Sequence, residues 1–299
     1  AKMGIQNSKL WINETRKKSI PTALIQGRLS EKSFIRWNLV KNTVNKLFNN
    51  FNPLIVQTNK DFKNFKKLGI KNISGIYNLK NHVSNVKLNK SKITSFLSKK
   101  LDRPTIIAVS THNGEEEIIL NSHKFIKNSF TNLLTIIIPR HPERAENILK
   151  LINTKSLSYS IRSLSKLPSK KTEIYLADTF GEVPTLIYCS DIVLLGGTFI
   201  PLGGHNIIEP AQLSKPIICG PETSKIEEPL RLLIKNNGAI KTKDFKSLNN
   251  SIIKLLKNPK KARAMGRNAK KTISQIPASN NIVYDLLKKN IPGNWNEYS

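Results

Sequence analysis

Short apolar runs that alternate with amphipathic stretches limit the fold of this sequence more than any other feature. The apolar runs, such as those at 105–109 and 192–195, are typical of buried strands. The stretches between them carry apolar residues at helical spacing. This rhythm predicts βαβ units, in which helices cover both faces of a parallel sheet. We therefore expect an α/β protein.

The first third of the sequence predicts a small domain. We expect strands at residues 22–26, 53–57 and 73–77, with helices at 10–18, 31–48 and 60–67. Ser30 is expected to cap the second of these helices, and Glu31 places a negative charge in its first turn. A further helix at 90–101 ends before Asp102-Arg103-Pro104, so we place the first domain at residues 1–101.

A second and larger domain is expected at residues 102–276. Its strands are predicted at 104–110, 134–139, 159–162, 173–177, 192–196 and 216–219, and its helices at 115–129, 142–151, 182–189, 207–213, 225–236, 245–256 and 260–276. About six strands are usual for a doubly wound sheet, and the first domain supplies roughly half of that. We therefore expect two Rossmann-like domains facing across a cleft, the first lacking its opening βαβ units. A helix at 281–289, within residues 277–299, is expected to pack back toward the first domain.

The sequence is strongly basic, with 49 Lys and Arg against 20 Asp and Glu and a formal net charge of +29. This balance indicates either a surface for nucleic acid or anionic lipid, or a coding bias toward Lys, Asn and Ile. We interpret the Lys residues as spread along the chain rather than collected on one helix. The sequence shows no RNP, zinc-finger or helix-turn-helix pattern, so we expect no nucleic-acid partner.

Cysteine usage argues against a protein held together by a cysteine-ligated metal, and hydropathy argues against a membrane-spanning helix. Cys189 and Cys219 lie inside apolar runs without metal-ligand spacing, so we expect buried free thiols in a reducing compartment. No apolar run approaches the ~18 residues that a membrane-spanning helix requires.

Two loops of the second domain carry glycines beside polar residues. Asp178-Thr179-Phe180-Gly181-Glu182 joins a strand to a helix, and such a helix start binds anions, unless Asp178 or Thr179 simply caps it. Gly196-Gly197 and the string Gly203-Gly204-His205-Asn206-Ile207-Ile208-Glu209-Pro210 follow the next strand. Glycine pairs let backbone approach a ligand closely. Glu209 is placed to accept hydrogen bonds from a ribose diol or to complete a capping box.

Two more loops follow the first strands of the same domain. Pro139-Arg140-His141-Pro142 forms a rigid turn, in which Arg140 suits a phosphate or is an ordinary surface residue. Ser110 and Thr111 end another strand and are expected to face a ligand, whereas the glutamates after Gly114 are expected to cap a helix. All four loops fall at carboxyl ends of strands, where open α/β sheets bind ligands. The sequence therefore predicts one binding crevice.

Together these motifs resemble the 3-deoxy-D-manno-octulosonic acid (Kdo) transferases of lipopolysaccharide synthesis, which have the GT-B fold. The resemblance extends from about Leu10 to about Asn281, and its matching strings also include Gly27-Arg28-Leu29-Ser30, Asn78-Leu79-Lys80 and Glu143-Arg144. It implies a CMP-Kdo donor, a lipid A precursor as acceptor, and a peripheral location on the cytoplasmic face of the inner membrane. It implies CMP contacts from Pro139, Arg140, Phe180, Gly181, Glu182, Asn206, Ile207, Ile208 and Glu209. Lys80 matches a lysine that stabilises the transition state, and no metal cofactor is expected.

The sequence also departs from the family pattern. The glutamate that serves as catalytic base in the family lies in a first βαβ unit that is not in this sequence, and neither is the family's N-terminal membrane anchor. Asn7 stands near Leu10-Trp11 where the family has an acidic residue. We therefore expect a chain that binds CMP but turns over poorly. The alternatives are a non-catalytic remnant or split-gene product, and a GT-B transferase that uses another nucleotide sugar such as a UDP-sugar.

Overall fold

The computed structural model describes residues 5–79, 86, 88–164, 166–276 and 279–293. Within the chain, contacts define two compact units, which are described separately below. The first comprises Ala1–His82 with Pro277–Ser299, and the second comprises Val83–Ile276.

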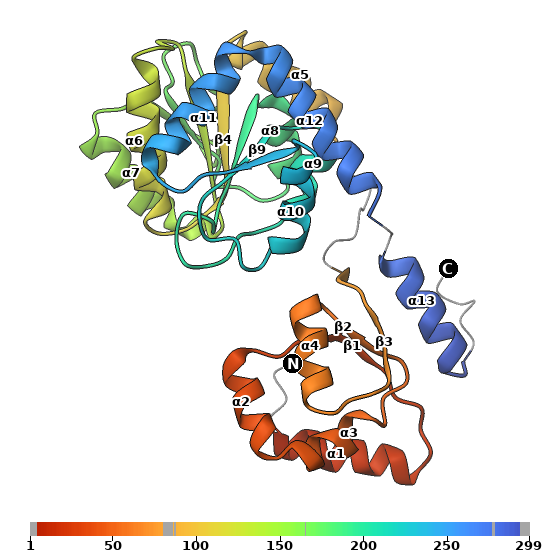
Figure 1. Cartoon of the computed structure of the whole chain (residues 1–299). Coiled ribbons are helices and arrows are strands. Elements are labelled where there is room, and N and C mark those ends of the chain that lie inside the picture. The colour runs from red at the N-terminus through yellow and green to blue at the C-terminus, as the bar shows by residue number, and fades with distance from the viewer. Residues whose placement is uncertain (1–4, 80–85, 87, 165, 277–278, 294–299) are drawn as a thin grey trace. The chain divides into compact units, whose positions relative to one another are not determined.

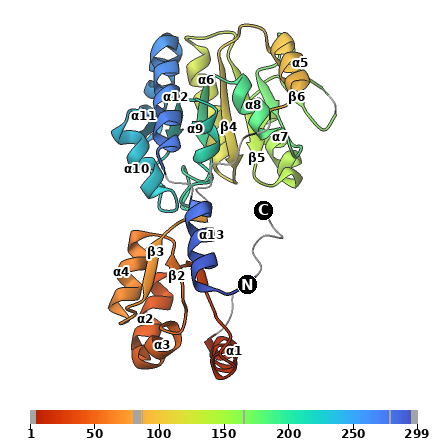
Figure 2. The same cartoon turned by 90° about the vertical axis from the view of Figure 1, so that its right-hand side faces the viewer.

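The first unit is a small parallel sheet with helices. Its elements in chain order are α1 (Ile5–Lys17), β1 (Leu24–Gly27), α2 (Glu31–Leu39), α3 (Lys41–Phe48), β2 (Leu54–Val56), α4 (Asn59–Lys67), β3 (Ile73–Ile76) and, from the C-terminal segment, α13 (Ser279–Asn290). The strands pair in the order β1-β2-β3, and both pairings are parallel. The core is formed by β2 together with aromatic and aliphatic side chains of α3 and α4, among them Phe48 and Phe65. Figure 2 shows these strands beside α4.

The helix expected at 31–48 is divided into α2 and α3. Val40 separates them with non-helical backbone angles, φ −117° and ψ 36°. α2 has no buried residue, whereas α3 buries Val44, Leu47 and Phe48. The two segments therefore pack differently, and the chain changes direction between them. The prediction of a single helix was wrong. The predicted cap is confirmed, because the Ser30 side chain accepts a hydrogen bond from the Ser33 amide.

The second unit is a doubly wound α/β domain (Figure 1). Its elements are α5 (Lys90–Lys100), β4 (Thr105–Thr111), α6 (Glu115–Lys127), β5 (Leu134–Pro139), the 3-10 helix η2 (Pro142–Arg144), α7 (Ala145–Thr154), β6 (Tyr159–Ile161), β7 (Ile174–Leu176), α8 (Val183–Cys189), β8 (Ile192–Leu195), α9 (Ile208–Gln212), β9 (Ile217–Cys219), α10 (Glu227–Lys235), β10 (Ala239–Lys241), α11 (Phe245–Lys257) and α12 (Pro259–Ser274). The strand β10 was not predicted, because it is short and its outer residue Lys241 is exposed.

The sheet of the second unit fixes where a ligand can bind. In the part of the chain that the structure describes, its strand order is β10-β9-β8-β4-β5-β7-β6, and every pairing is parallel. The chain winds outward from β4 through β5 and then returns to the other side of β4 at β8. The strand order therefore reverses between β4 and β8, so their carboxyl ends form the topological switch point, where open α/β sheets bind ligands.

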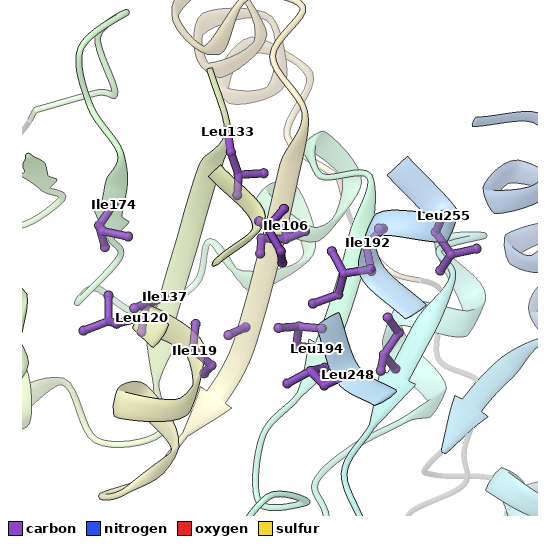
Figure 3. Close-up of a cluster of buried hydrophobic side chains, with 14 of the residues drawn as sticks. Ile106, Ile119, Leu120, Leu133, Ile137, Ile174, Ile192, Leu194, Leu248 and Leu255 are labelled. Atoms are coloured by element: carbon purple, nitrogen blue, oxygen red, sulfur yellow. The ribbon is translucent and has the colours of Figure 1, made fainter. Parts of the chain in front are cut away.

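The core of this unit follows the two-residue period of its strands. Ile106 and Ala108 of β4 pack with α6, α7 and α11 in one cluster, part of which is drawn in Figure 3. Ile107 and Val109 of the same strand pack toward α5 and α8 in another. In Figure 1, α6 and α7 lie on one side of the strands and α8 and α9 on the other. Cys189 and Cys219 are buried free thiols, as predicted.

The contact-defined boundary lies before α5 rather than after it. The helix α5 packs on α8, and its Phe96 ring lies 5.4 Å from the Tyr175 ring between centroids. The structure therefore groups residues 83–101 with the second unit, whereas the sequence suggested a boundary after residue 101.

The helix α12 has a cationic face. α12 has 16 residues, none acidic, and its exposed cations are Lys260, Lys261, Arg263, Arg267, Lys270 and Lys271. Its opposite face is buried, through residues such as Met265 and Ala269. These six cations are a small part of the 49 Lys and Arg residues, so the interpretation that the Lys residues are spread along the chain holds beside a cationic face on α12. No helix among the described residues is both long and apolar enough to cross a membrane.

Candidate functional site

The four loops predicted to form a crevice lie at one edge of the sheet in the second unit. They follow β4, β5, β7 and β8, whose carboxyl ends meet at that edge. The loop after β4 begins at Thr111, which pairs with Pro139 of β5, and the Arg140 amide donates to the Thr111 carbonyl at 2.9 Å.

Glu115 joins the loop after β4 to the loop after β8. Its side chain is fully buried, and its carboxylate accepts hydrogen bonds from four backbone amides. The donors are His112 at 3.0 Å, Gly197 at 2.8 Å, Thr198 at 3.1 Å and Phe199 at 3.0 Å. Burial raises the pKa of Glu115, and the amide donors oppose that rise. This carboxylate therefore holds two loops together rather than capping a helix or meeting a ligand.

Glu116 connects the loop after β4 to the turn after β5. Its buried carboxylate receives the Thr111 hydroxyl at 2.8 Å and both terminal nitrogens of Arg144, at 2.7 and 3.1 Å. Such a two-pronged pair is strong and directional. It fixes the turn that carries Arg140, so Thr111, predicted to face a ligand, instead uses its hydroxyl inside the protein.

The glycine pair after β8 is required for close packing within the protein and not only for access of a ligand. A Cβ on Gly196 would collide with the backbone carbonyls of Val109 and Ser110. Gly197 has φ +70°, and a Cβ there would lie 2.9 Å from Cδ2 of the His205 ring. These glycines thus allow the loop after β8 to lie directly against β4 and against the imidazole of His205.

His205 and His112 form a close pair across the switch point. Their Nε2 atoms lie 2.7 Å apart, and their rings meet edge to edge with centroids 4.9 Å apart and planes 10° from parallel. Burial is the main cause that lowers the pKa of His205 to about 4, with smaller contributions from His112, Arg140 and Lys225. Burial also lowers the pKa of His112. The pair is therefore neutral at neutral pH.

Three predicted site residues have polar groups without a partner among the described residues. The Arg140 guanidinium is exposed, and the Ser110 hydroxyl is partly exposed. Ser110 has φ 58°, a strained conformation for a residue other than glycine, at the point where the β4–β5 register shifts. The Glu209 carboxylate is half-buried, and burial raises its pKa. A half-buried carboxylate without a hydrogen-bond donor is costly unless a ligand supplies one.

The loop after β7 presents backbone rather than charge. The Glu182 carboxylate pairs with Arg162, whose Nε lies 2.6 Å away, and with Lys92 at 2.9 Å. These partners, Arg162 first, lower the pKa of Glu182 to about 2. Phe180 is 82% exposed, and Gly181 has φ +82°. Any contact from this loop to a ligand would come from Phe180 and the backbone at Gly181.

Neither residue predicted as a cap of α8 serves as one. Asp178 accepts the Ser163 amide at 2.9 Å, and the Thr179 hydroxyl donates to Glu182 at 3.0 Å. The N-cap position is Glu182, without a side-chain hydrogen bond to the helix. The capping prediction was wrong because both side chains are used by neighbouring segments.

The last predicted segment divides into buried and exposed residues. Ile207 and Ile208 are buried in the core, so only their backbone is available to a ligand. Asn206 is exposed, and its side-chain oxygen accepts the Ile208 amide at 3.0 Å. Glu209 makes no capping interaction with the described residues, so the capping-box interpretation is wrong.

Lys80 lies outside the described residues, so its predicted role stays a prediction. In the described ranges, no group of three or more His, Cys, Asp or Glu side chains is arranged to hold a metal ion.

Sequence reasoning missed the groups that brace the site, namely Glu115, Glu116, Arg144, Arg162 and His112. Apart from the His112 amide and the Thr111 hydroxyl, their partners lie between 20 and 93 positions away in sequence, as in the pairs Arg162–Glu182 and His112–His205. The sequence does show an acidic first turn after a strand. A glutamate that caps a helix and a buried glutamate that binds distant groups have the same local pattern, so the sequence does not distinguish them.

Solved structures resemble this arrangement of a parallel sheet with a crevice at its switch point. The C-terminal CMP-Kdo binding domain of WaaA from Acinetobacter baumannii matches 62% of this chain and 100% of that domain, with a TM-score of 0.58 and 26% identity. Anabaena HepE in complex with UDP-glucose matches 95% of this chain and 76% of its own, with a TM-score of 0.61 and 13% identity, a likeness that shows the fold alone. The chain is thus an α/β protein with the GT-B glycosyltransferase fold.

Sequence relatives specify the family. A family model described as 3-deoxy-D-manno-octulosonic-acid transferase (kdotransferase) matches residues 6–83. A Haemophilus influenzae protein named 3-deoxy-D-manno-octulosonic acid transferase is 30% identical over 293 residues, which cover 95% of this chain and 68% of the relative. The chain belongs to the 3-deoxy-D-manno-octulosonic acid transferase family.

The match does not cover the whole of these relatives. The Rickettsia prowazekii transferase is 34% identical over 271 residues, which cover 89% of this chain but 58% of the relative. The chain thus spans somewhat more than half the length of that relative.

Proposed function

We propose that this chain is a glycosyltransferase that uses CMP-Kdo as donor and a lipid A precursor as acceptor. The observation that carries the donor assignment is the Glu209 carboxylate, half-buried at the switch-point crevice without a donor among the described residues. A ribose diol supplies two O–H donors to such a group. The likeness to a domain named for CMP-Kdo binding, and the family, support CMP as the nucleotide.

In this proposal the other free groups at the crevice complete the donor site. The exposed Arg140 guanidinium holds the phosphate, because its planar array of donors suits phosphate oxygens. Pro139, Phe180, Gly181 and the backbone at Asn206–Ile208 contact the remainder of CMP. Lys80 and Arg140 then stabilise negative charge as CMP leaves, without a metal cofactor.

Calorimetric titration with CMP, and separately with UDP, tests the donor site. We expect CMP to bind and UDP to bind at least tenfold more weakly, and equal affinities would contradict the assignment. Glu209→Gln is expected to weaken CMP binding about tenfold, because one neutral amide replaces a charged acceptor of about 1.5–3 kcal/mol. The matched control is Glu227→Gln, an exposed glutamate in the first turn of α10, which should leave the affinity unchanged.

The acceptor and the cellular location follow from the same family resemblance. We propose that the chain works at the cytoplasmic face of the inner membrane and that the cationic face of α12 contacts anionic headgroups. Its six exposed cations support this, since each Lys or Arg near such a surface adds about 1 kcal/mol.

Vesicle sedimentation tests the membrane contact. Vesicles with anionic lipid should carry the chain down, and purely zwitterionic vesicles should not. Reversing the charge of Lys260, Arg263 and Arg267 should release the chain more strongly than reversing the exposed Lys32, Lys63 and Lys71 of the first unit. Equal effects of the two triple variants would argue against α12.

A further inference from the structure

Three of the five histidines in the chain gather at the carboxyl ends of β4, β5 and β8. The His112 ring meets His205 edge to edge through the two Nε2 atoms, and its other neighbour is the His141 ring, 5.8 Å away between centroids and nearly perpendicular. His141 lies beside the exposed Glu143 carboxylate, with its Nδ1 3.4 Å from Oε1, whereas Glu115 is occupied by backbone amides and Glu116 by Arg144.

The close approach of the two Nε2 atoms fixes how many protons the pair can hold. At 2.7 Å one Nε2 must carry a proton and the other must accept it. In the neutral pair, one Nδ1 is therefore a donor and the other is an acceptor. Neither Nδ1 has a partner in the part of the chain that the structure describes. A single added proton would turn both Nδ1 atoms into donors while the Nε2 contact is kept.

The surroundings of the pair are cationic. The groups that face His205 are His112, Arg140, Lys225 and His141, and all of them disfavour a charge on it. His112 faces His141, Arg144 and Arg140, with only Glu116 acting in the opposite sense. Without a ligand the pair therefore stays neutral, whereas a bound dianion would reverse the balance, since an opposite charge within 4–6 Å shifts a pKa by about 1–3 units.

We propose that a phosphate monoester binds beside the His112–His205 pair and that the pair takes up one proton from solvent as it binds. The proposal rests on the CMP site described above and extends it, because it assigns the histidine pair as a positioning group with a protonation change. The proton comes from the buffer, and no covalent bond of the ligand changes. In the protonated pair both Nδ1 atoms donate toward anionic oxygen, and the added positive charge offsets the phosphate.

Calorimetry of CMP binding at pH 6.5, in two buffers of different ionisation enthalpy, measures the protons exchanged. CMP itself loses protons on binding, because its second phosphate pKa is about 6. The informative quantity is therefore the difference between the wild-type chain and His205→Gln. Glutamine keeps an amide near the Nε2 position but cannot take up a proton. We expect the wild-type chain to take up more protons per CMP than this variant, up to about 0.8, because a rise of at most about 3 units from a pKa of about 4 leaves the pair partly protonated at pH 6.5.

His141→Asn is the matched control, because it removes a neighbouring histidine outside the pair. It should keep the proton uptake of the wild-type chain, and loss of uptake in this variant would overturn the assignment to the pair. Equal proton exchange in the wild-type chain and His205→Gln, with CMP bound to both, would overturn the inference and leave the CMP site standing. Failure of CMP to bind the wild-type chain would overturn both.

If His205→Gln does not fold, nitrogen NMR of labelled histidine in the wild-type chain replaces it. Saturating CMP should then shift the ring nitrogens of two coupled histidines toward protonated values. Unchanged ring-nitrogen shifts at saturation would contradict the uptake.

Discussion

Glu115 offers the sharpest test of how the site is held together. Glu115→Gln changes the side chain by one atom type and keeps its size. In the wild-type chain Oε1 accepts from Thr198 and Phe199, and Oε2 accepts from His112 and Gly197. The glutamine has one carbonyl oxygen, so two of the four backbone donors would instead face an NH2 group.

The expected loss follows from those two donors. A buried donor left without an acceptor costs about 1–3 kcal/mol, so two cost about 2–6 kcal/mol. Removing a buried charge returns part of this, since burial disfavours the ionised form of Glu115. We therefore expect the second unit to lose about 2–4 kcal/mol in free energy of unfolding.

Urea denaturation followed by far-UV circular dichroism measures this loss. With a slope of about 2 kcal/mol per molar urea, the transition midpoint of the second unit should fall by about 1–2 M. Trp295 lies outside the described residues, and the other two tryptophans, Trp11 and Trp37, belong to the first unit. Their fluorescence transition should therefore be unchanged, which provides an internal control.

The matched variant is Glu117→Gln, two residues along the same helix. Glu117 is exposed, and its carboxylate lies 3.8 Å from the Lys155 Nζ. We expect it to cost less than about 0.5 kcal/mol. If Glu115→Gln and Glu117→Gln have the same midpoint, the four amide bonds contribute nothing to stability and the reasoning is refuted.

Three further outcomes are expected. The pKa of Glu182 is lowered from 4.5 to about 2, so its ion pairs stabilise the folded state above pH ~4.5, and that stability is lost as the pH falls toward 2. The free energy of unfolding measured against pH should show this loss, and Glu182→Gln should make it less dependent on pH in that range. Gly197→Ala should lower the melting temperature more than Gly181→Ala, because both have positive φ but only the first places a Cβ against an imidazole ring; equal shifts would contradict this. Burial raises the pKa of Cys189 to about 11 and of Cys219 to about 12, so neither thiol should react with a disulfide reagent within minutes until urea is added, and rapid reaction of the native chain would show exposure.

The strands show how far local pattern alone predicts this fold. β4, β5 and β8 each contain a buried run of three or more apolar residues, and their predicted positions agree with the structure to within a residue or two. β10 escaped prediction because its three residues, Ala239–Lys241, have no such run. A strand with its own apolar run can be predicted from the sequence. The edge strand β10 has no such run and is defined by its pairing with β9, so the sequence does not predict it.

The helices show a different limit. The amphipathic pattern at 31–48 reads as one helix, but Val40 divides it because α2 and α3 pack in different surroundings. On α12 the spacing of the cations does not by itself define a face. The cationic face is recognised because the opposite side of the helix is buried. Packing therefore decided both features.

By itself the sequence determined the α/β class, the order of its strands and helices in the second unit, and the four loops that end at the carboxyl edge of one sheet. These follow from periodicity and from the rule that parallel strands end together. Only the tertiary structure decided which polar groups at that edge are hydrogen-bonded within the protein and which are free to bind a ligand. Glu115, Glu116 and Glu182 are held by distant partners, whereas Arg140 and Glu209 are not. The physical reason is that a carboxylate has the same local sequence pattern whether its donors come from the protein or from a ligand, and only the fold brings those donors within reach.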